Sequence, residues 1–503
     1  MKKSTSSSII IVGAGIAGLS TGCYAQMNGY QSTIFEMHAI PGGLCTAWKR
    51  KGYTFDLSMH FLVGSKSGAF YQMWQELGLM ENQQFHYHDE IAYVEGLHKS
   101  LSLCADPQRL LDQLIALSPA DAKLSREFVR LVSGRGMMGS ASLKSPELSG
   151  TFDNLKMLLA VLPQIGMLRR CGNKTFQEFV QGFQDSFVRD AVRCFGDAPD
   201  WPMQGFPLSA MAGLIDATVT DAGVPLGGSQ KAVFKIAEKY QKLGGEIIYN
   251  QRVTDILVEH DRAVGIRLED GSEHRADSVA WAGDGHTAIF DILGGRYLDD
   301  KIRKIYEEWT VVQPLVHVSM GVARDLSEQP YRFIFELEEP LQIAGQERRW
   351  LSLRHRCFDP SMAPPGKSAA EVWYPTSYAY WEELARDRAR YEDEKKRIAE
   401  ATIAALDKRW PGFAAQIEVV DVATPMTYVR YTGNWQGSPD GWYITTGNMM
   451  DQTPVRSLAG LSDFYMVGQW TAPFAGTVIS ALSGRQLIEV LCKHDNRAFV
   501  TSG

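Results

Sequence analysis

The sequence predicts an α/β fold in which a discontinuous Rossmann-type domain for a dinucleotide carries a second domain of antiparallel sheet and helices. Three observations lead to this prediction. A glycine-rich turn joins an apolar strand to a helix near the N-terminus, hairpin-like strands follow in the middle of the chain, and a final strand, loop and helix lie near the C-terminus. With 503 residues, 45% of them hydrophobic, the chain has the material for two or three domains.

Charge and cysteine content argue against several classes of function. The net charge of -7 and the lack of a long basic run argue against nucleic acid as a partner. The seven cysteines are scattered without a CxxC pair, which predicts neither a metal site nor a disulfide framework and favours the reducing cytoplasm. The letters MKKSTSSSIIIVGAG lead straight into the glycine turn, so we expect no signal peptide there.

The first motif predicts a dinucleotide site. Residues 9–12 form a run of β-branched residues, as a buried parallel strand requires, and Gly13-Ala-Gly15-Ile-Ala-Gly18 follows at once. The first glycine permits the tight turn, the second lets backbone approach a pyrophosphate, and the third lets the next helix pack on the strand. That helix, expected over residues 16–28, points its N-terminus at the phosphates. The residues expected at the cofactor here are Gly13, Gly15, Ile16, Ala17 and Gly18.

An acidic residue supports the same site. After the helix stop at Asn28-Gly29, residues 32–36 are expected to form the second strand. Glu36, at the end of that strand, is placed to accept a hydrogen bond from a ribose hydroxyl. A lone GxGxxG is a weak signal, whereas strand, helix, helix stop and acid together predict dinucleotide binding.

A second glycine pair follows in Pro41-Gly42-Gly43-Leu44-Cys45-Thr46 and lets backbone approach another portion of the same cofactor. This segment resembles the GG motif of FAD-dependent oxidoreductases of the amine oxidase and phytoene desaturase superfamily. The following GYTFDLSMHFL resembles a stretch of the carotenoid desaturase and isomerase branch. The resemblance implies FAD, with Gly42, Gly43 and Leu44 at its site. Leu44 stands where amine oxidases usually carry Arg, and Ser58 replaces the usual Gly.

The middle of the chain resembles the returning flavin-domain segment of the same family. Residues 225–284 are expected to form a helix, a strand and hairpin strands around the Asp270-Gly271 turn. The resemblance places the backbone of Val253 at the adenine. Asp284, after VAWAG, either contacts the cofactor or caps the next helix.

The stretch FYMVGQWTAPFAGTVISALSG, residues 464–484, carries no formal charge. It has the length of a membrane span, but interspersed Gly, Pro, Ser and Thr favour a soluble structure. We expect a strand ending at Gly468 and a helix starting near Gly476, or else simply buried core. The resemblance implies that this segment closes the FAD site through Gly468, Gln469, Gly476, Thr477 and Val478. Phe474 replaces a usual glycine and is expected to alter the space near the flavin ring.

The motifs divide the chain into five segments. Residues 1–90, 221–310 and 425–503 are expected to form the FAD domain, and residues 91–220 and 311–424 the substrate domain. Two segments of the first insertion, residues 157–170 and 201–215, carry no charge except for Arg169 and Arg170 at the end of the first. They are either a helical cap or an interfacial patch with the two arginines near lipid headgroups. The second alternative is the expectation, which places the protein in the cytoplasm with peripheral membrane contact.

The resemblance implies an enzyme that exchanges hydride at flavin N5 with a long apolar polyene, as a desaturase, saturase or isomerase. His60 and Arg430 are the expected proton donor and positioning group, although His60 is equally suited to a structural role. Only one clear GxGxxG is present, so we expect an external electron donor or acceptor. Two alternatives remain: a flavin amine oxidase, and a non-catalytic prenyl or lipid carrier of the same fold.

Overall fold

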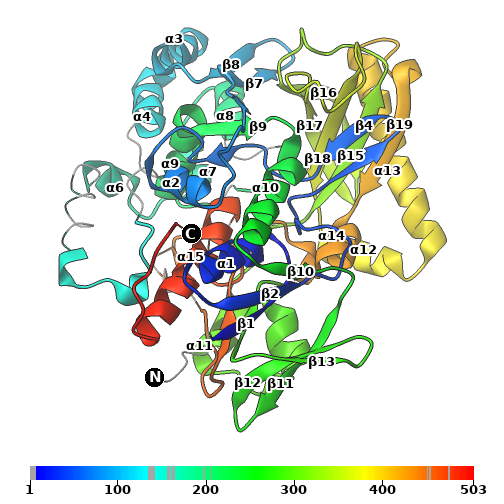
Figure 1. The fold of residues 1–503 in the computed structure, drawn as a ribbon. Helices are drawn as coiled ribbons and strands as arrows, with labels where there is room; N and C mark the ends of the chain where they lie inside the picture. Colours follow the sequence, from blue (N-terminus) through cyan, green and yellow to red (C-terminus); the bar gives the residue numbers. More distant parts are fainter. Residues whose placement is uncertain are drawn as a thin grey trace.

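The computed structural model describes residues 7–133, 142–153, 155, 159, 162, 165–195, 199–203, 205–449, 451, 455–473 and 476–502. These residues form two domains, with the parallel sheet and its helices in one and a larger sheet with a separate group of helices in the other (Figure 1). The α/β class and the discontinuous Rossmann-type domain agree with the prediction.

The first domain is built on a five-stranded parallel sheet whose strands come from three separate parts of the chain. Its order is β10 (Glu246–Ile248), β2 (Gln31–Phe35), β1 (Ser8–Val12), β14 (Ser278–Trp281) and β20 (Phe464–Met466). β1 lies at the centre, and both of its faces are covered, which is why its apolar residues run without alternation.

The two faces of β1 meet different layers. Ile9 and Ile11 pack on the side of α1 (Ile16–Met27), α10 (Gly228–Lys242) and α15 (Gly476–His494). Ile10 and Val12 pack on the side of an antiparallel sheet of β11 (Val253–Glu259), β12 (Arg262–Leu268) and β13 (Glu273–Arg275). Figure 1 shows the three helices above the parallel sheet and the antiparallel strands below it.

The second domain joins strands from both predicted insertions into one seven-stranded sheet. Its order is β19 (Ile417–Ala423), β15 (Leu315–Val322), β18 (Ser368–Pro375), β17 (Gln346–His355), β16 (Arg332–Ile343), β7 (Glu90–Glu95) and β8 (Ser100–Cys104). Every neighbouring pair is antiparallel except β16 and β7, which run parallel and come from different insertions. The expected boundaries near residues 220, 310 and 424 fall between elements, whereas the one near residue 90 falls at the first residue of β7.

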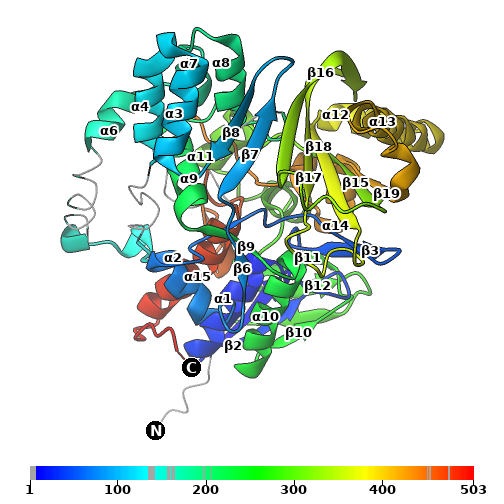
Figure 2. The ribbon, with the colours of Figure 1, turned by 90° about the horizontal axis from the view of Figure 1, so that it is seen from above.

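Helices cover this sheet in two groups (Figure 2). α12 (Tyr378–Ala385) and α13 (Arg388–Arg409) pack on one side of it. The other group, a helical cap from the first insertion, comprises α3 (Pro107–Leu117), α4 (Ala122–Val132), α6 (Ile165–Cys171), α7 (Phe176–Val180), α8 (Ser186–Arg193) and α9 (Leu208–Thr220).

Short elements connect the two domains. They are β3 (Ala47–Arg50), β4 (Tyr53–Asp56), β5 (Leu62–Val63), α2 (Gly68–Glu76), β6 (Phe85–His86), β9 (Ala222–Pro225), α11 (Asp300–Glu308) and α14 (Pro425–Thr432). The β4–β5 connection and the segment after α14 supply residues to the site described below.

The lipid-facing prediction for residues 201–215 is wrong. No described residue of this segment is exposed, and α9 buries Leu208, Met211 and Ile215 in the core of the helical cap. The alternative of a cap fits the structure, because these apolar residues have protein partners. In residues 157–170, positions 157, 158, 160, 161, 163 and 164 lie outside the described residues, as does Phe474. Among the helices that the structure describes, none combines the length and apolar content that a membrane span needs.

Candidate active site

A groove runs along the carboxyl ends of the parallel strands, where Val12, Phe35 and Trp281 line it. Of the sixteen residues predicted to bind the cofactor, all but Gly18 and Val478 line this groove. Gly18 acts in packing instead, since a Cβ there would lie 1.9 Å from the carbonyl oxygen of Gly13. The carboxyl edge of a parallel sheet is where such folds bind nucleotides.

The glycine turn leaves room for a ligand at the start of α1. A Cβ added to Gly15 would meet no atom within 4 Å, so the missing side chain opens space on the groove side. No side chain caps the N-terminus of α1, which leaves its first N–H groups available to an anion. Gly42 holds the second glycine pair against this turn, because its N–H donates to the Ala14 carbonyl at 2.9 Å. The cradle therefore fits a pyrophosphate.

The Glu36 carboxylate is fixed by two backbone donors. The Ala14 N–H donates to Oε2 at 2.7 Å and the His38 N–H donates to Oε1 at 2.9 Å. Each oxygen keeps a second lone pair, so the buried carboxylate is able to accept a hydroxyl donor from the groove.

Asp284 caps the following turn, which is one of the two roles that the sequence left open, and it also lines the groove. Its Oδ1 accepts the Thr287 N–H at 2.7 Å, which caps the following helical turn, and its Oδ2 accepts the Trp435 N–H at 2.9 Å. Burial raises the pKa of this carboxyl group, and the residue lines the groove beside Val253.

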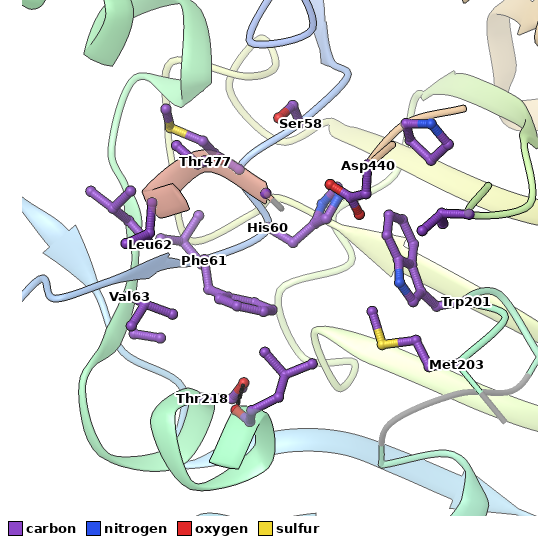
Figure 3. A pocket seen from close by; sticks show the side chains of 18 of the residues that line it. Ser58, His60, Phe61, Leu62, Val63, Trp201, Met203, Thr218, Asp440 and Thr477 are labelled. Carbon is purple, nitrogen blue, oxygen red and sulfur yellow. Dashed lines mark hydrogen bonds between the residues drawn. The ribbon is translucent and has the colours of Figure 1, made fainter. Parts of the chain in front are cut away.

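A second cavity, of ≈ 280 Å³, opens from the end of the groove. The two spaces share Leu44, Ser58, Pro439, Asp440, Gly476 and Thr477. Both positions that depart from the family pattern, Leu44 and Ser58, thus lie at this junction. Val478 lines the cavity rather than the groove. Figure 3 shows an apolar side with Phe61, Leu62 and Val63, and a side that carries His60, Trp201 and Asp440.

His60 lines the cavity from the β4–β5 connection. Its ring packs against Trp373 with centroids 4.1 Å apart, and the preceding Met59 adopts a φ of 50°, which is uncommon for a residue with a side chain. Burial, together with the positive charge of Arg354, holds the pKa of His60 well below its usual value. The imidazole is therefore neutral near pH 7, which suits the structural role better than that of a proton donor.

The prediction for Arg430 is wrong. Arg430 is exposed, lines neither the groove nor the cavity, and has its guanidinium carbon 5.5 Å from the centre of the Tyr431 ring. The reason is helical geometry: α14 turns Tyr428 into the cavity, and a residue two positions later points about 200° away.

Two other arginines line the cavity, and no sequence motif points to them. Arg332 and Arg354 both form ion pairs with Asp200, the latter at 2.6 Å, and all three side chains are buried. Ser352 Oγ also donates to Asp200 at 2.9 Å, and Arg354 lies 3.9 Å from the centre of the Trp373 ring. Asp200 comes from the first insertion and the arginines from the second, so no local pattern predicts their meeting.

Three further polar residues at the cavity escaped sequence reasoning. Tyr428 and His317 share a hydrogen bond of 2.7 Å, and burial lowers the pKa of His317 to about 3. Asp440 lies in the Pro-Asp-Gly turn after α14, and burial raises the pKa of its carboxyl group to about 6. The PDG letters signal only a turn. The arrangement as a whole suits redox chemistry on a mostly apolar molecule that reaches a dinucleotide at the shared junction.

Comparisons with known proteins agree with this geometry. Prolycopene isomerase of Arabidopsis thaliana is 25% identical over 96% of this chain and 82% of its own length. A lycopene-forming phytoene desaturase of a Paracoccus species is 24% identical, with 93% of each chain covered. Among solved structures, putrescine oxidase with bound putrescine matches with a TM-score of 0.62 at 12% identity, covering 97% of this chain and 99% of that one. An oxidoreductase from Methanosarcina mazei matches with a TM-score of 0.61 at 16% identity, covering 96% and 100%.

The sequence profile described as flavin containing amine oxidoreductase matches residues 16–486. This range begins directly after Gly15 and contains Glu36, the second glycine pair, the closing strand and the first part of the closing helix. The chain therefore belongs to the flavin-containing amine oxidoreductase family, as an FAD-dependent oxidoreductase.

Proposed function

We propose that this enzyme changes carbon–carbon bonds of a long, mostly apolar polyene or isoprenoid-like molecule, by desaturation, saturation or isomerisation. One observation carries the proposal: the cavity that joins the cofactor groove is lined largely by Leu, Ile, Val, Phe and Met side chains. The names of the relatives, a prolycopene isomerase and phytoene desaturases, support the same substrate class.

FAD would be held by the glycine turns, Glu36 and the start of α15, and when bound it supplies hydride exchange at N5. The chain supplies the rest. The junction residues Leu44 and Ser58 limit the approach of the substrate to the cofactor, and the apolar wall excludes water and aligns the chain. Electrons come from or go to an external partner such as a quinone or dioxygen, unless the reaction is an isomerisation without net redox change.

The test is an absorption spectrum of the purified protein, denatured to release flavin, followed by incubation with polyenes with and without a chemical reductant. Stoichiometric FAD and product formed only with reductant would indicate saturation or isomerisation. Product formed by the oxidised enzyme would indicate desaturation. Protein that binds no FAD even when FAD is supplied would instead point to a lipid carrier.

A flavin amine oxidase is the second candidate, and one observation favours it. The Asp440 carboxylate lines the cavity and would pair with a protonated amine. Rapid flavin reduction by alkylamines, combined with no conversion of any polyene, would establish this alternative. The likeness to putrescine oxidase concerns the fold alone at 12% identity.

We also propose cytoplasmic location with peripheral membrane contact through the region around residues 157–170. Leu155, Leu159 and Leu162 are 52%, 56% and 49% exposed, and Arg169 and Arg170 are exposed nearby in the sequence. A Leu159→Ser/Leu162→Ser variant should co-float less with anionic liposomes than the wild type. Leu97→Ser, a change at another exposed leucine of the substrate domain (55%), is the matched control and should co-float as the wild type does. Equal flotation of all three proteins would exclude this surface.

A further inference from the structure

Asp440 occupies the junction between the cofactor groove and the substrate cavity. It lines both spaces, and its Oδ1 lies 4.0 Å from the position of a Cβ built on Gly476, the first residue of α15. Figure 3 shows its carboxylate projecting into the cavity, which His60 also enters from a different segment. A group at this junction reaches substrate atoms that lie next to the cofactor.

The backbone around Asp440 is fixed. Gly441 has a φ of +68°, and a Cβ there would lie 2.7 Å from the carbonyl oxygen of Gln469, so the turn tolerates only glycine without rearrangement. The carbonyl of Gly441 accepts the Val312 N–H at 2.8 Å and the Ser438 hydroxyl at 3.2 Å. The turn therefore fixes the backbone position from which the side chain of Asp440 projects.

The carboxylate itself has no hydrogen-bond donor and no ion-pair partner among the described residues. Other buried acids near the cavity differ, since Asp200 faces Arg332 and Arg354, and Glu371 faces Arg356. Partial removal of an unpaired carboxylate from water costs free energy, so the half-buried Asp440, without a partner in a cleft, is a candidate for a chemical role.

We propose that Asp440 is a catalytic residue whose carboxyl group exchanges a proton with the substrate carbon adjacent to the one that exchanges hydride. This inference rests on the proposed function and names the acid/base group of that reaction.

The step balances in both directions. In dehydrogenation, one C–H bond breaks, and oxidised FAD, when bound, would accept its electron pair as hydride. The neighbouring C–H bond breaks, its proton passes to an Asp440 oxygen, and its electron pair becomes the new π bond. Asp440 then releases the proton to solvent, and a quinone or dioxygen takes the two electrons. In saturation the π bond breaks instead, and the carbons gain a proton from Asp440 and a hydride that an external reductant supplies through FAD.

Asp440 is the group at the junction suited to titrate between pH 5 and 8. Burial raises the pKa of the Asp440 carboxyl to about 6. The Tyr428 phenol and the Cys45 thiol face it and stay protonated, because burial raises both pKa values. Burial lowers the pKa values of His60, His317 and His88, so these rings stay neutral. Arg332 and Arg354 keep their charge opposite Asp200.

The first test is a binding measurement on the FAD-loaded enzyme with N,N-dimethyldecylamine, a cation, and decanol, its neutral counterpart. With a pKa of about 6, the ionised fraction of Asp440 is about tenfold larger at pH 7.5 than at pH 5, so calorimetry should show about tenfold tighter amine binding. Asp440→Asn should remove this dependence and leave decanol binding unchanged, and Asp440→Glu should restore it. Amine affinity at pH 7.5 that is equal in Asp440→Asn and wild type would overturn the proposal.

The second test uses turnover of the polyene that the wild type converts. Asp440→Asn should retain FAD and lower kcat at least about 100-fold with little change in KM, and the inflection near pH 6 should disappear. A wild-type rate that rises through this pH indicates that Asp440 accepts the proton, and a falling rate that it donates. Asp112→Asn, on the exposed side of α3, is the charge control and should match the wild type.

The outcomes separate this inference from the proposed function. Wild-type polyene turnover that Asp440→Asn retains would overturn the catalytic role and leave the proposed function intact. Loss of FAD from Asp440→Asn would also overturn it, by making Asp440 a cofactor contact. A wild type that converts no polyene but is reduced by amines would overturn the proposed function itself.

Discussion

At the scale of single residues, the site depends on charges that are buried and paired. Asp200 is 1% exposed and forms ion pairs with two buried arginines. The fold tolerates the burial of these charges because each lies beside an opposite charge. The same cluster fixes Arg354 over the Trp373 ring, against which His60 also packs. The polar side of the cavity is therefore one connected unit.

Removal of the Asp200 charge should be costly. Asp200→Asn leaves Arg332 and Arg354 buried without a counter-charge, and we expect the free energy of unfolding to fall by about 3–5 kcal/mol. The matched control is Asp255→Asn, which breaks an ion pair with Arg267 whose side chains are 39% and 42% exposed. That change should cost less than about 1 kcal/mol. Urea unfolding of both variants measures the difference, and similar losses would contradict the account.

At the scale of elements, the cofactor groove depends on how closely helices approach the sheet and one another. α15 packs closely against α1 at Gly484, because a Cβ on this glycine would lie 2.7 Å from the backbone nitrogen of Thr21 in α1. Gly18 similarly brings α1 onto the glycine turn. Gly15 differs from these glycines, because the space beside it is open.

This difference predicts separate effects on folding and on cofactor binding. Gly15 has a φ of -71° that alanine adopts, so Gly15→Ala should leave the melting temperature of the apoprotein unchanged while its methyl group enters the groove and weakens FAD binding. We expect about a tenfold or larger rise in the Kd for FAD, measured by flavin fluorescence. Gly166→Ala, at an equally open position in α6, is the control and should change neither quantity. Unchanged FAD affinity in Gly15→Ala would contradict the placement of the pyrophosphate.

At the scale of the whole molecule, the two domains meet around a cavity whose histidines are neutral because they are buried. His317 is 1% exposed, and burial, with the charges of Arg354 and Arg356, lowers its pKa to about 3. In the unfolded chain the same group has a pKa of about 6.5. Below that pH the unfolded chain binds a proton that the folded protein does not, so acid favours unfolding.

His317 should therefore add stability at neutral pH that is lost as the pH falls below about 6.5. Relative to His317→Gln, which does not titrate, the wild type should lose about 2 kcal/mol of unfolding free energy between pH 7.5 and pH 5. The comparison of two proteins at each pH cancels the other titrating groups. A difference between them that stays constant with pH would show that His317 has the same pKa in the folded protein as in the unfolded chain.

The sequence by itself determined the fold class and the cofactor domain of this protein. The strand at residues 9–12, the glycine turn, Glu36, the Gly42-Gly43 pair and the closing segment after Gly468 are local patterns, and each needs only neighbouring residues to specify its conformation. For the same reason the sequence predicted that two insertions build the second domain.

Only the tertiary structure decided which polar residues come together at the cavity. Asp200, Arg354 and Asp440 lie far apart along the chain and meet because two insertions pack on the flavin domain. The prediction for Arg430 failed because the rotation of a short helix about its axis decides which of its side chains faces the cavity. Residues 201–215 form a buried cap because the second domain covers them. Burial and long-range pairing set the charge states of this site, and neither is a local property of the sequence.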